Sequence, residues 1–319
     1  MKIGMNTDSL GSLSFAEVLG AAAELGLDCV EFATGNWSTA PHLDLDALLA
    51  DAATHDALTG AVGDHGLEIS ALTCNGNQLH PGGSGREHDR VVRGTIELAG
   101  LIGVRTVILM SGCPGAPGDA HPNWITVAWP PETTEILVWQ WDEVMIPYWR
   151  DLVRFAAGHG IAELAIEMHG GQAVYNVETL MRLREAAGEA VGANFDPSHL
   201  MWMGADPLAA IRALGRAIFH VHAKDTRIEA NAAVNSRIET RPAPRAAERS
   251  WNYVTLGYGH DEAFWRAFAL ELRRAGYDGV LSIEHEDFAM SPMEGMRKSV
   301  ELLRRAAIFE PPGYALPEV

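Results

Sequence analysis

Four apolar segments in the second half of the sequence each end in an acid or a histidine. The segments that read as short buried strands are residues 164–168, 192–195, 217–221 and 279–283. The side chains at their carboxyl ends are Glu167, Asp196, His222 and Glu284. Each acid alone could simply begin a solvated loop, but four such ends in succession favour a shared site. Because three clustered carboxylates repel one another unless a cation lies between them, we predict a metal centre.

The ligand types narrow the choice of metal. Two glutamates, an aspartate and a neutral histidine offer oxygen and nitrogen without thiolates, which suits Mn²⁺, Mg²⁺, Co²⁺ or Zn²⁺. We predict one divalent ion, with Mn²⁺ as the first choice. Such an ion, bound to a carbonyl oxygen and a neighbouring hydroxyl, acidifies the C–H bond between them and stabilises an enediolate. A nearby glutamate can then remove the proton as a general base.

The fate of that proton distinguishes several reactions. Its return on the opposite face gives epimerisation, and its transfer to the neighbouring carbon gives aldose–ketose isomerisation. Loss of a leaving group β to the carbonyl gives a lyase or dehydratase. Because the first step is shared, the ligand set alone does not choose among them.

Strand ends meet in this way only if the strands share one rim. Eight apolar segments alternate with eight helical ones along the chain, which predicts a parallel sheet of the α/β class. Eight such units predict a closed (β/α)8 TIM barrel with its chemistry at the carboxyl rim. A doubly wound open sheet is the alternative, but no glycine-rich dinucleotide fingerprint follows the first strand.

The sequence predicts one barrel domain with additions. We expect the barrel to span residues 1–307, with two long rim-side insertions at about 113–140 and 225–258. Loops of this length inside a compact domain are usually lids or binding loops. A Pro-rich tail follows at 308–319.

Composition excludes several classes of function. The 319 residues include 24 lysines and arginines against 42 acids, a formal net charge of −18, which disfavours a nucleic-acid partner. Cys29, Cys74 and Cys113 are odd in number and lack metal-finger spacing, as expected in a reduced compartment. The sequence shows neither the apolar core of a signal peptide nor a run of about 18 apolar residues. We expect a soluble, cytoplasmic protein with no membrane partner.

The strand ends also resemble a known group, the xylose isomerase-like TIM-barrel superfamily of sugar phosphate isomerases and epimerases. The motifs that carry the resemblance are Ile166-Glu167-Met168-His169, Phe195-Asp196-Pro197-Ser198-His199, His220-Val221-His222-Ala223-Lys224-Asp225 and Ser282-Ile283-Glu284. The group includes ketose 3-epimerases and inosose dehydratases. The resemblance implies that Glu167, Asp196, His222 and Glu284 bind one divalent ion. It also implies that Glu167 and Glu284 transfer protons as the catalytic residues.

The resemblance extends to substrate-binding residues, with two departures. In the epimerases the histidine three residues after the aspartate contacts substrate, which implies His199 here. A further acid six residues after the first glutamate is replaced by Ala173. The substrate arginine there follows the metal histidine by six residues, whereas Arg227 follows His222 by five.

Other candidates for substrate binding lie near these motifs. His169 could act as a base or as a hydrogen-bond donor beside the ligands, or could bond only to a neighbouring loop. Lys224 could orient or protonate the substrate, or could pair with Asp225. Aromatic rings on rim-side loops can stack on a sugar or pack a lid, and those in such loops are Trp37, His80 and Trp124.

The sequence therefore predicts a metal-dependent enzyme acting on a small-molecule sugar or keto-sugar, with isomerase or epimerase activity first. The alternative is a lyase or dehydratase on a 3-keto sugar, keto-inositol or keto-glycoside, including C-glycoside deglycosidase-like chemistry. In that case the insertion at 113–140 would receive an aromatic aglycone. An endonuclease IV-like nuclease and a non-catalytic barrel are further alternatives. The sequence leaves open a monomer, a homo-oligomer or a hetero-oligomer.

Overall fold

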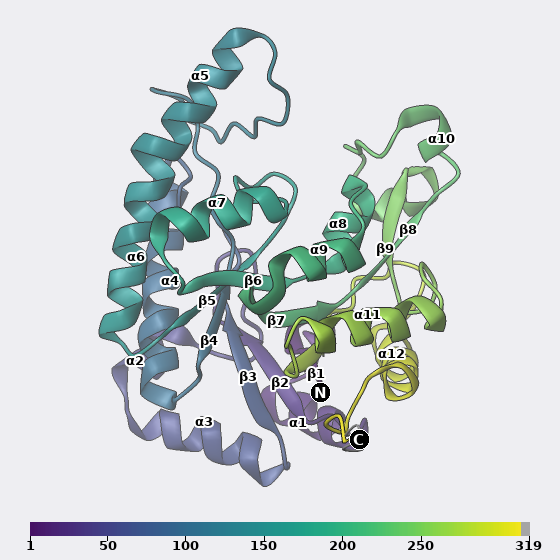
Figure 1. Ribbon diagram of the computed structural model, residues 1–319. Coiled ribbons are helices and arrows are strands. Elements are labelled where there is room, and N and C mark those ends of the chain that lie inside the picture. Colours follow the sequence, from purple (N-terminus) through teal and green to yellow (C-terminus); the bar gives the residue numbers. More distant parts are fainter. Residues whose placement is uncertain (314–319) are drawn as a thin grey trace, which may run out of the picture.

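The computed structural model describes residues 1–313 and forms the predicted (β/α)8 barrel as a single domain. Its eight parallel strands close in the order β1-β10-β7-β6-β5-β4-β3-β2 (Figure 1). Their bounds are β1 (Lys2–Asn6), β2 (Cys29–Ala33), β3 (Glu68–Thr73), β4 (Thr106–Leu109), β5 (Glu163–Glu167), β6 (Val191–Phe195), β7 (Ile218–Ala223) and β10 (Val280–Ile283). Every carboxyl strand end therefore lies at one rim, as the metal prediction requires.

Amphipathic helices pack around the barrel. They are α1 (Phe15–Glu24), α2 (Leu45–Ala50), α3 (Ala53–Asp64), α4 (Gly83–Ile102), α6 (Ile146–Gly158), α7 (Val177–Ala187), α9 (Pro207–Leu214), α11 (Glu262–Arg274) and α12 (Pro292–Ala306). Local sequence starts several of them. In α1, the side chain of Ser14 accepts from the amide of Glu17, and the Glu17 carboxylate accepts from the Ser14 amide at 2.8 Å. This reciprocal cap satisfies amides that the first helical turn would leave unpaired.

The first segment expected as an insertion is partly helical. An irregular stretch follows β4, but α5 (Pro131–Trp139) then continues through a π-helical turn (Gln140–Met145) into α6. Pro131 suits the first helical turn, because the amide it lacks would have no helical partner there. Residues 131–140, expected to lie in a loop, are thus the start of a long helix (Figure 1).

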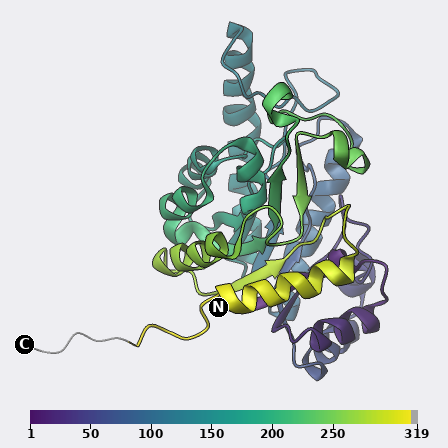
Figure 2. The same ribbon diagram turned by 90° about the vertical axis from the view of Figure 1, so that its right-hand side faces the viewer.

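The second segment contains a hairpin that the sequence patterns did not indicate. β8 (Asp225–Ile228) pairs antiparallel with β9 (Trp251–Val254). Between them lie α10 (Ala232–Asn235) and a 3-10 helix (Ala243–Glu248). Because it follows β7, this hairpin rises from the same end of the barrel as α5 (Figures 1 and 2). The two segments therefore flank the mouth of the barrel.

The interior of the barrel is layered. Ala71, Ile108 and Ala165 form a small apolar cluster, with Phe219 packed against it. The barrel strands also carry buried polar side chains, which include Glu31, Thr73, Glu167, Asn194, His220, His222 and Ser282. Electrostatic interactions are stronger in such surroundings than in water, and buried polar groups there need partners.

The first residue of the chain contacts the segment that follows the last helix. The Met1 ammonium donates to Asp278 at 2.7 Å and to the carbonyl of Ile308 at 3.0 Å. Residues 314–319 of the predicted tail lie outside the described residues. Within residues 1–313, none of the helices combines the length and hydrophobicity needed to cross a membrane.

Candidate metal centre and active site

The structure brings the four predicted ligands together at the carboxyl rim. One ligand atom from each of Glu167, Asp196, His222 and Glu284 lies within 4.8 Å of the others. Glu167 ends β5 and His222 is the fifth residue of β7, while Asp196 and Glu284 directly follow β6 and β10. The four candidate ligands thus come from four adjacent strands, and closure of the barrel brings their side chains together.

Two buried atoms of this cluster fit a metal ion closely. Asp196 caps α8 (Pro197–Met203), because its Oδ1 accepts from the amide of Ser198 at 2.8 Å. Its Oδ2, like Nδ1 of His222, is buried and makes no hydrogen bond within residues 1–313. His222 Nδ1 also lies 3.1 Å from Glu284 Oε2 and 3.3 Å from Glu167 Oε2. A nitrogen lone pair and carboxylate oxygens that converge in this way suit a divalent cation.

Glu31 on β2 is a member of the site that sequence reasoning missed. Both of its carboxylate oxygens lie 3.1 Å from Nε2 of His222, and Ser282 donates to Oε2 at 2.8 Å. Thr73 donates to its other oxygen, Oε1. Burial acts to raise the pKa of Glu31, but the charges of His222 and His220 outweigh it and lower the pKa. The sequence feature that could have identified Glu31 is its position as an acid inside the otherwise apolar segment 29–33.

The Glu31 contact fixes the orientation of the metal histidine. When Nε2–H of His222 donates to Glu31, the lone pair of Nδ1 is left to face Asp196, Glu167 and Glu284. A carboxylate on the far nitrogen is the usual partner of a metal-bound histidine. Burial acts to lower the pKa of His222, but Glu31 and Glu284 outweigh it and hold the pKa well above its usual value. The site therefore attracts positive charge.

His199 contacts the Glu167 oxygen that does not face His222. Its Nε2 is 2.9 Å from Glu167 Oε1, and its Nδ1 is 2.8 Å from the Tyr253 hydroxyl of β9. Burial acts to lower the pKa of His199, but Asp196 and Glu167 outweigh it and raise the pKa to about 9. These contacts hold Glu167 in position within the ligand cluster.

His169 packs behind His199. The two ring centroids are 4.1 Å apart, and Nδ1 of His169 lies against the carbonyl of Gly170. Burial, followed by the charge of His199, lowers the pKa of His169 to about 4. His169 is therefore a neutral neighbour of the cluster near neutral pH.

Lys224 extends the site beyond β7. Its ammonium lies 3.1 Å from Glu284 and 2.9 Å from Glu286, and 4.3 Å from the centre of the Tyr253 ring. Burial acts to lower the pKa of Lys224, but Glu284 and Glu286 outweigh it and hold the pKa well above its ordinary value. Lys224 does not pair with Asp225, which instead binds the 257–260 turn through three backbone amides.

The remaining candidates are placed differently. Arg227 points away from the cluster, with its side chain 59% exposed and paired with Glu229 at 3.4 Å. Trp37 is half-exposed on the loop after β2, and its amide donates to the carbonyl of Asn75. His80 accepts from the Gly82 amide at 2.9 Å. Trp124 forms a T-shaped pair with Tyr175 across the rim, with ring centroids 5.7 Å apart.

Asp8, beyond β1, is a second acid that sequence reasoning left out. Its Oδ2 accepts from the Ser38 hydroxyl at 2.5 Å, while Oδ1 is buried without a hydrogen bond within residues 1–313. Burial raises the pKa of Asp8, and the charges of Glu284 and Glu31 add to the rise. The sequence feature that could have identified Asp8 is its position two residues after the first strand.

Comparisons with known proteins agree with this geometry. Residues 19–306 match the family model described as "Xylose isomerase-like TIM barrel". The chain is 49% identical to the protein YfiH of Bacillus subtilis (strain 168) over 309 residues, which cover 96% of this chain and 99% of YfiH. The protein therefore belongs to the xylose isomerase-like TIM-barrel family, a group of sugar isomerases and epimerases.

Three solved structures share the fold over nearly their full lengths. An IOLI protein with a bound zinc atom has a TM-score of 0.66 and 18% identity, covering 96% of this chain and 98% of the other. The probable 3-DHS dehydratase AsbF of Bacillus anthracis has a TM-score of 0.66 and 16% identity, covering 95% and 99%. A D-tagatose 3-epimerase-like protein has a TM-score of 0.65 and 19% identity, covering 96% and 97%. At these identities the likeness shows the fold alone.

Proposed function

We propose that the protein is a divalent-metal-dependent isomerase or epimerase of a sugar or keto-sugar. The observation that carries the proposal is the convergence of four ligand atoms within 4.8 Å. Two of the residues, Asp196 and His222, hold there a buried polar atom that makes no hydrogen bond within residues 1–313. When bound, the ion, for which we propose Mn²⁺, would stabilise negative charge on a substrate oxygen as the adjacent C–H bond loses its proton.

Glu167 and Glu284 are the proposed proton carriers. Glu167 ends β5 and Glu284 directly follows β10, and these strands are separated in the barrel by β6 and β7, so the two carboxylates would approach a bound substrate from different sides. Asn194 and Asn75 donate to Oε2 of Glu167 at 3.1 and 3.2 Å, and His199 holds Oε1. Oε2 of Glu284 has the Lys224 ammonium and Nδ1 of His222 each at 3.1 Å, and the Glu284 side chain is 16% exposed against 3% for Glu167. Glu284 is thus the freer carboxylate, and we assign it the first proton abstraction.

His199 and Lys224 are the proposed donors to substrate oxygens. Both side chains are buried beside the carboxylates of the proposed metal ligands. Hydrogen bonds made there are stronger than the same bonds made in water. Each would orient a sugar hydroxyl or carbonyl and exclude water from the reacting carbon. His169, packed against His199, would keep that imidazole in place.

Carbon-bound deuterium exchange tests the proposal. The protein is loaded with Mn²⁺, freed of excess ion, and incubated in D₂O with ketoses, aldoses, hydroxypyruvate, inosose and 3-keto glycosides. Products are followed by NMR and mass spectrometry, with an EDTA-treated sample as the control. We expect deuterium at one carbon of a rearranged sugar, and we expect EDTA to abolish it.

The same experiment distinguishes the alternative reaction. A product that has lost water or an aglycone would identify a lyase in which the same glutamate begins the reaction. Exchange that survives EDTA, or no exchange with any member of the panel, would contradict the metal-dependent proposal.

A further inference from the structure

A cavity of about 460 Å³ lies between the two segments that flank the barrel mouth. Its walls come from both segments and from α8, and they include Trp124, Tyr175, Leu200, Trp202, Ala205 and Ile238. This volume falls in the range of small-molecule pockets, which are mostly apolar and aromatic. None of these residues belongs to the metal cluster, so the cavity is a separate place for part of a ligand.

The cavity adjoins the metal centre through one glycine. Gly170 follows His169, whose ring packs on His199. A Cβ on Gly170 would lie 2.5 Å from Cζ2 of Trp202 and 3.5 Å from Cη2 of Trp124. Both cavity indoles therefore lie against the backbone three residues beyond Glu167. The cavity and the candidate metal centre are therefore neighbours at the rim, since Leu200 of the cavity wall also follows His199 directly.

Aromatic rings continue from the active site to this cavity. The hydroxyl of Tyr253 forms a hydrogen bond with His199, and its ring packs against Trp251 with ring centroids 5.1 Å apart. Trp251 stacks on Trp202 at 4.9 Å with an angle of 6° between the ring planes. Trp202, the member of this series that lines the cavity, offers an aromatic wall to the ring of a ligand.

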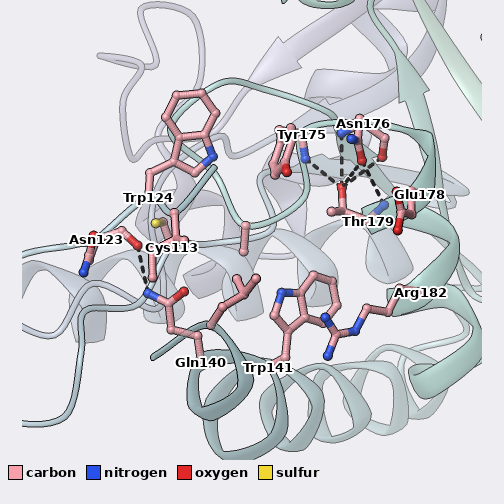
Figure 3. A pocket seen from close by; sticks show the side chains of 13 residues that line it. Cys113, Asn123, Trp124, Gln140, Trp141, Tyr175, Asn176, Glu178, Thr179 and Arg182 are labelled. Carbon is pink, nitrogen blue, oxygen red and sulfur yellow. Dashed lines mark hydrogen bonds between the residues drawn. The ribbon is translucent and has the colours of Figure 1, made fainter. Parts of the chain in front are cut away.

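The wall formed by Trp124 is held in place by its own segment. Trp124 and Tyr175 also line a smaller cavity of about 150 Å³ (Figure 3). There Nε2 of Gln140 donates to the carbonyls of Asn123 at 2.8 Å and Pro114 at 3.0 Å. These bonds tie the irregular stretch to the helical turn after α5, so the wall is preorganised for a ligand.

The charged groups of the larger cavity make hydrogen bonds within the protein. Arg237 donates to the carbonyl of Met201 at 2.9 Å, and Glu239 accepts from the amides of Arg241 and Ser250. Both charges are thus engaged by the protein itself. In contrast, Nε1 of Trp202 is buried and makes no hydrogen bond within residues 1–313.

We propose that this cavity is a subsite for an aromatic ring carried by the sugar substrate. The substrate class is then an aryl-substituted sugar or keto-sugar, and a free monosaccharide fills only the metal-side half of the site. This inference rests on the proposed function, because the sugar part must lie at the metal centre.

Binding of two inert glycosides tests the subsite. Phenyl and methyl β-D-glucopyranoside differ only in the group that would enter the cavity, and neither carries the carbonyl needed for turnover. Isothermal titration of the Mn²⁺-loaded protein should give a Kd at least about tenfold lower for the phenyl glycoside, since ring burial supplies the difference. Equal affinities would overturn the subsite.

Matched variants test whether the difference in affinity between the two glycosides arises in this cavity. Ala205 is exposed on the cavity wall, so Ala205→Phe fills the space from the surface and should bring the ratio of the two affinities close to one. Thr39 is exposed in a different rim cavity, and Thr39→Phe should leave the ratio unchanged. Trp124→Leu removes one aromatic wall and should lower the ratio even if Ala205→Phe fails to fold. A ratio unaffected by both cavity variants would overturn the assignment.

The outcomes separate this inference from the proposed function. Metal-dependent deuterium exchange on free sugars, together with equal affinities for the two glycosides, would leave the proposed function standing and reject the subsite. A phenyl preference that Ala205→Phe removes, without exchange in any sugar, would support the subsite and count against the proposed chemistry.

Discussion

His222 and Glu31 face each other across the barrel interior, with Nε2 of the imidazole 3.1 Å from both carboxylate oxygens. The other nitrogen of the same ring lies 3.1 Å from Glu284. One histidine thus connects a buried acid on β2 with the candidate metal ligands. This contact determines which ring nitrogen faces the candidate metal centre, and we propose Glu31 as a positioning residue.

Glu31→Gln should weaken Mn²⁺ binding about 10–100-fold, because an amide holds the histidine in the required orientation less well than a carboxylate. Calorimetric titration of the metal-free protein measures the loss directly, without reference to activity. Ser282→Ala removes a single donor to Glu31 and should have a smaller effect. Equal Mn²⁺ affinity in wild type and Glu31→Gln would mean that the contact is only structural.

Asp196→Asn should lower metal occupancy, because it replaces an anionic ligand by a neutral one. Asparagine is also a good helix cap, so the bond to the amide of Ser198 can persist and stability should change little. Glu167→Gln should lower occupancy for the same reason. Elemental analysis after dialysis measures both. Full metal content in the two variants would remove these residues from the centre.

Glu284→Gln should abolish proton transfer even in the fraction of protein that retains metal, because an amide cannot accept the proton. Deuterium exchange per metal-loaded site gives the comparison. Glu286→Gln is the matched control, because Glu286 also contacts Lys224 but its side chain is 46% exposed. Undiminished exchange in metal-loaded Glu284→Gln would show that another group is the base.

Asp225→Ala should destabilise the fold by on the order of 2–4 kcal/mol, because several donors lose a charged acceptor. The Asp225 carboxylate is fully buried and binds the amides of Gly257, Gly259 and His260. Urea unfolding followed by circular dichroism measures the change. Arg227→Ala removes only an exposed ion pair and should stay within about 0.5 kcal/mol. Similar losses in both variants would reject a special role for Asp225.

The sequence alone determined the barrel and the composition of its rim. Apolar strands alternate with amphipathic helices, and both periodicities are local properties that a reader of the sequence can count. Asp196, placed between an apolar strand and Pro197, and the glutamates at the ends of β5 and β10 are marked by the same local pattern. Parallel closure then brings any strand-end side chains to one rim, so their meeting followed from the fold class.

Only the tertiary structure decided which other residues join them. Glu31 lies 191 residues from His222 in the sequence, and barrel closure alone places the two in contact. Arg227 is directed outward because β8 turns away in a hairpin with β9, which the loop-like composition of 225–258 concealed. Lys224 pairs with Glu284 and Glu286 and not with its neighbour Asp225, because backbone amides of the 257–260 turn bind the Asp225 carboxylate. Side-chain partners of this kind depend on contacts between distant segments, which no local period encodes.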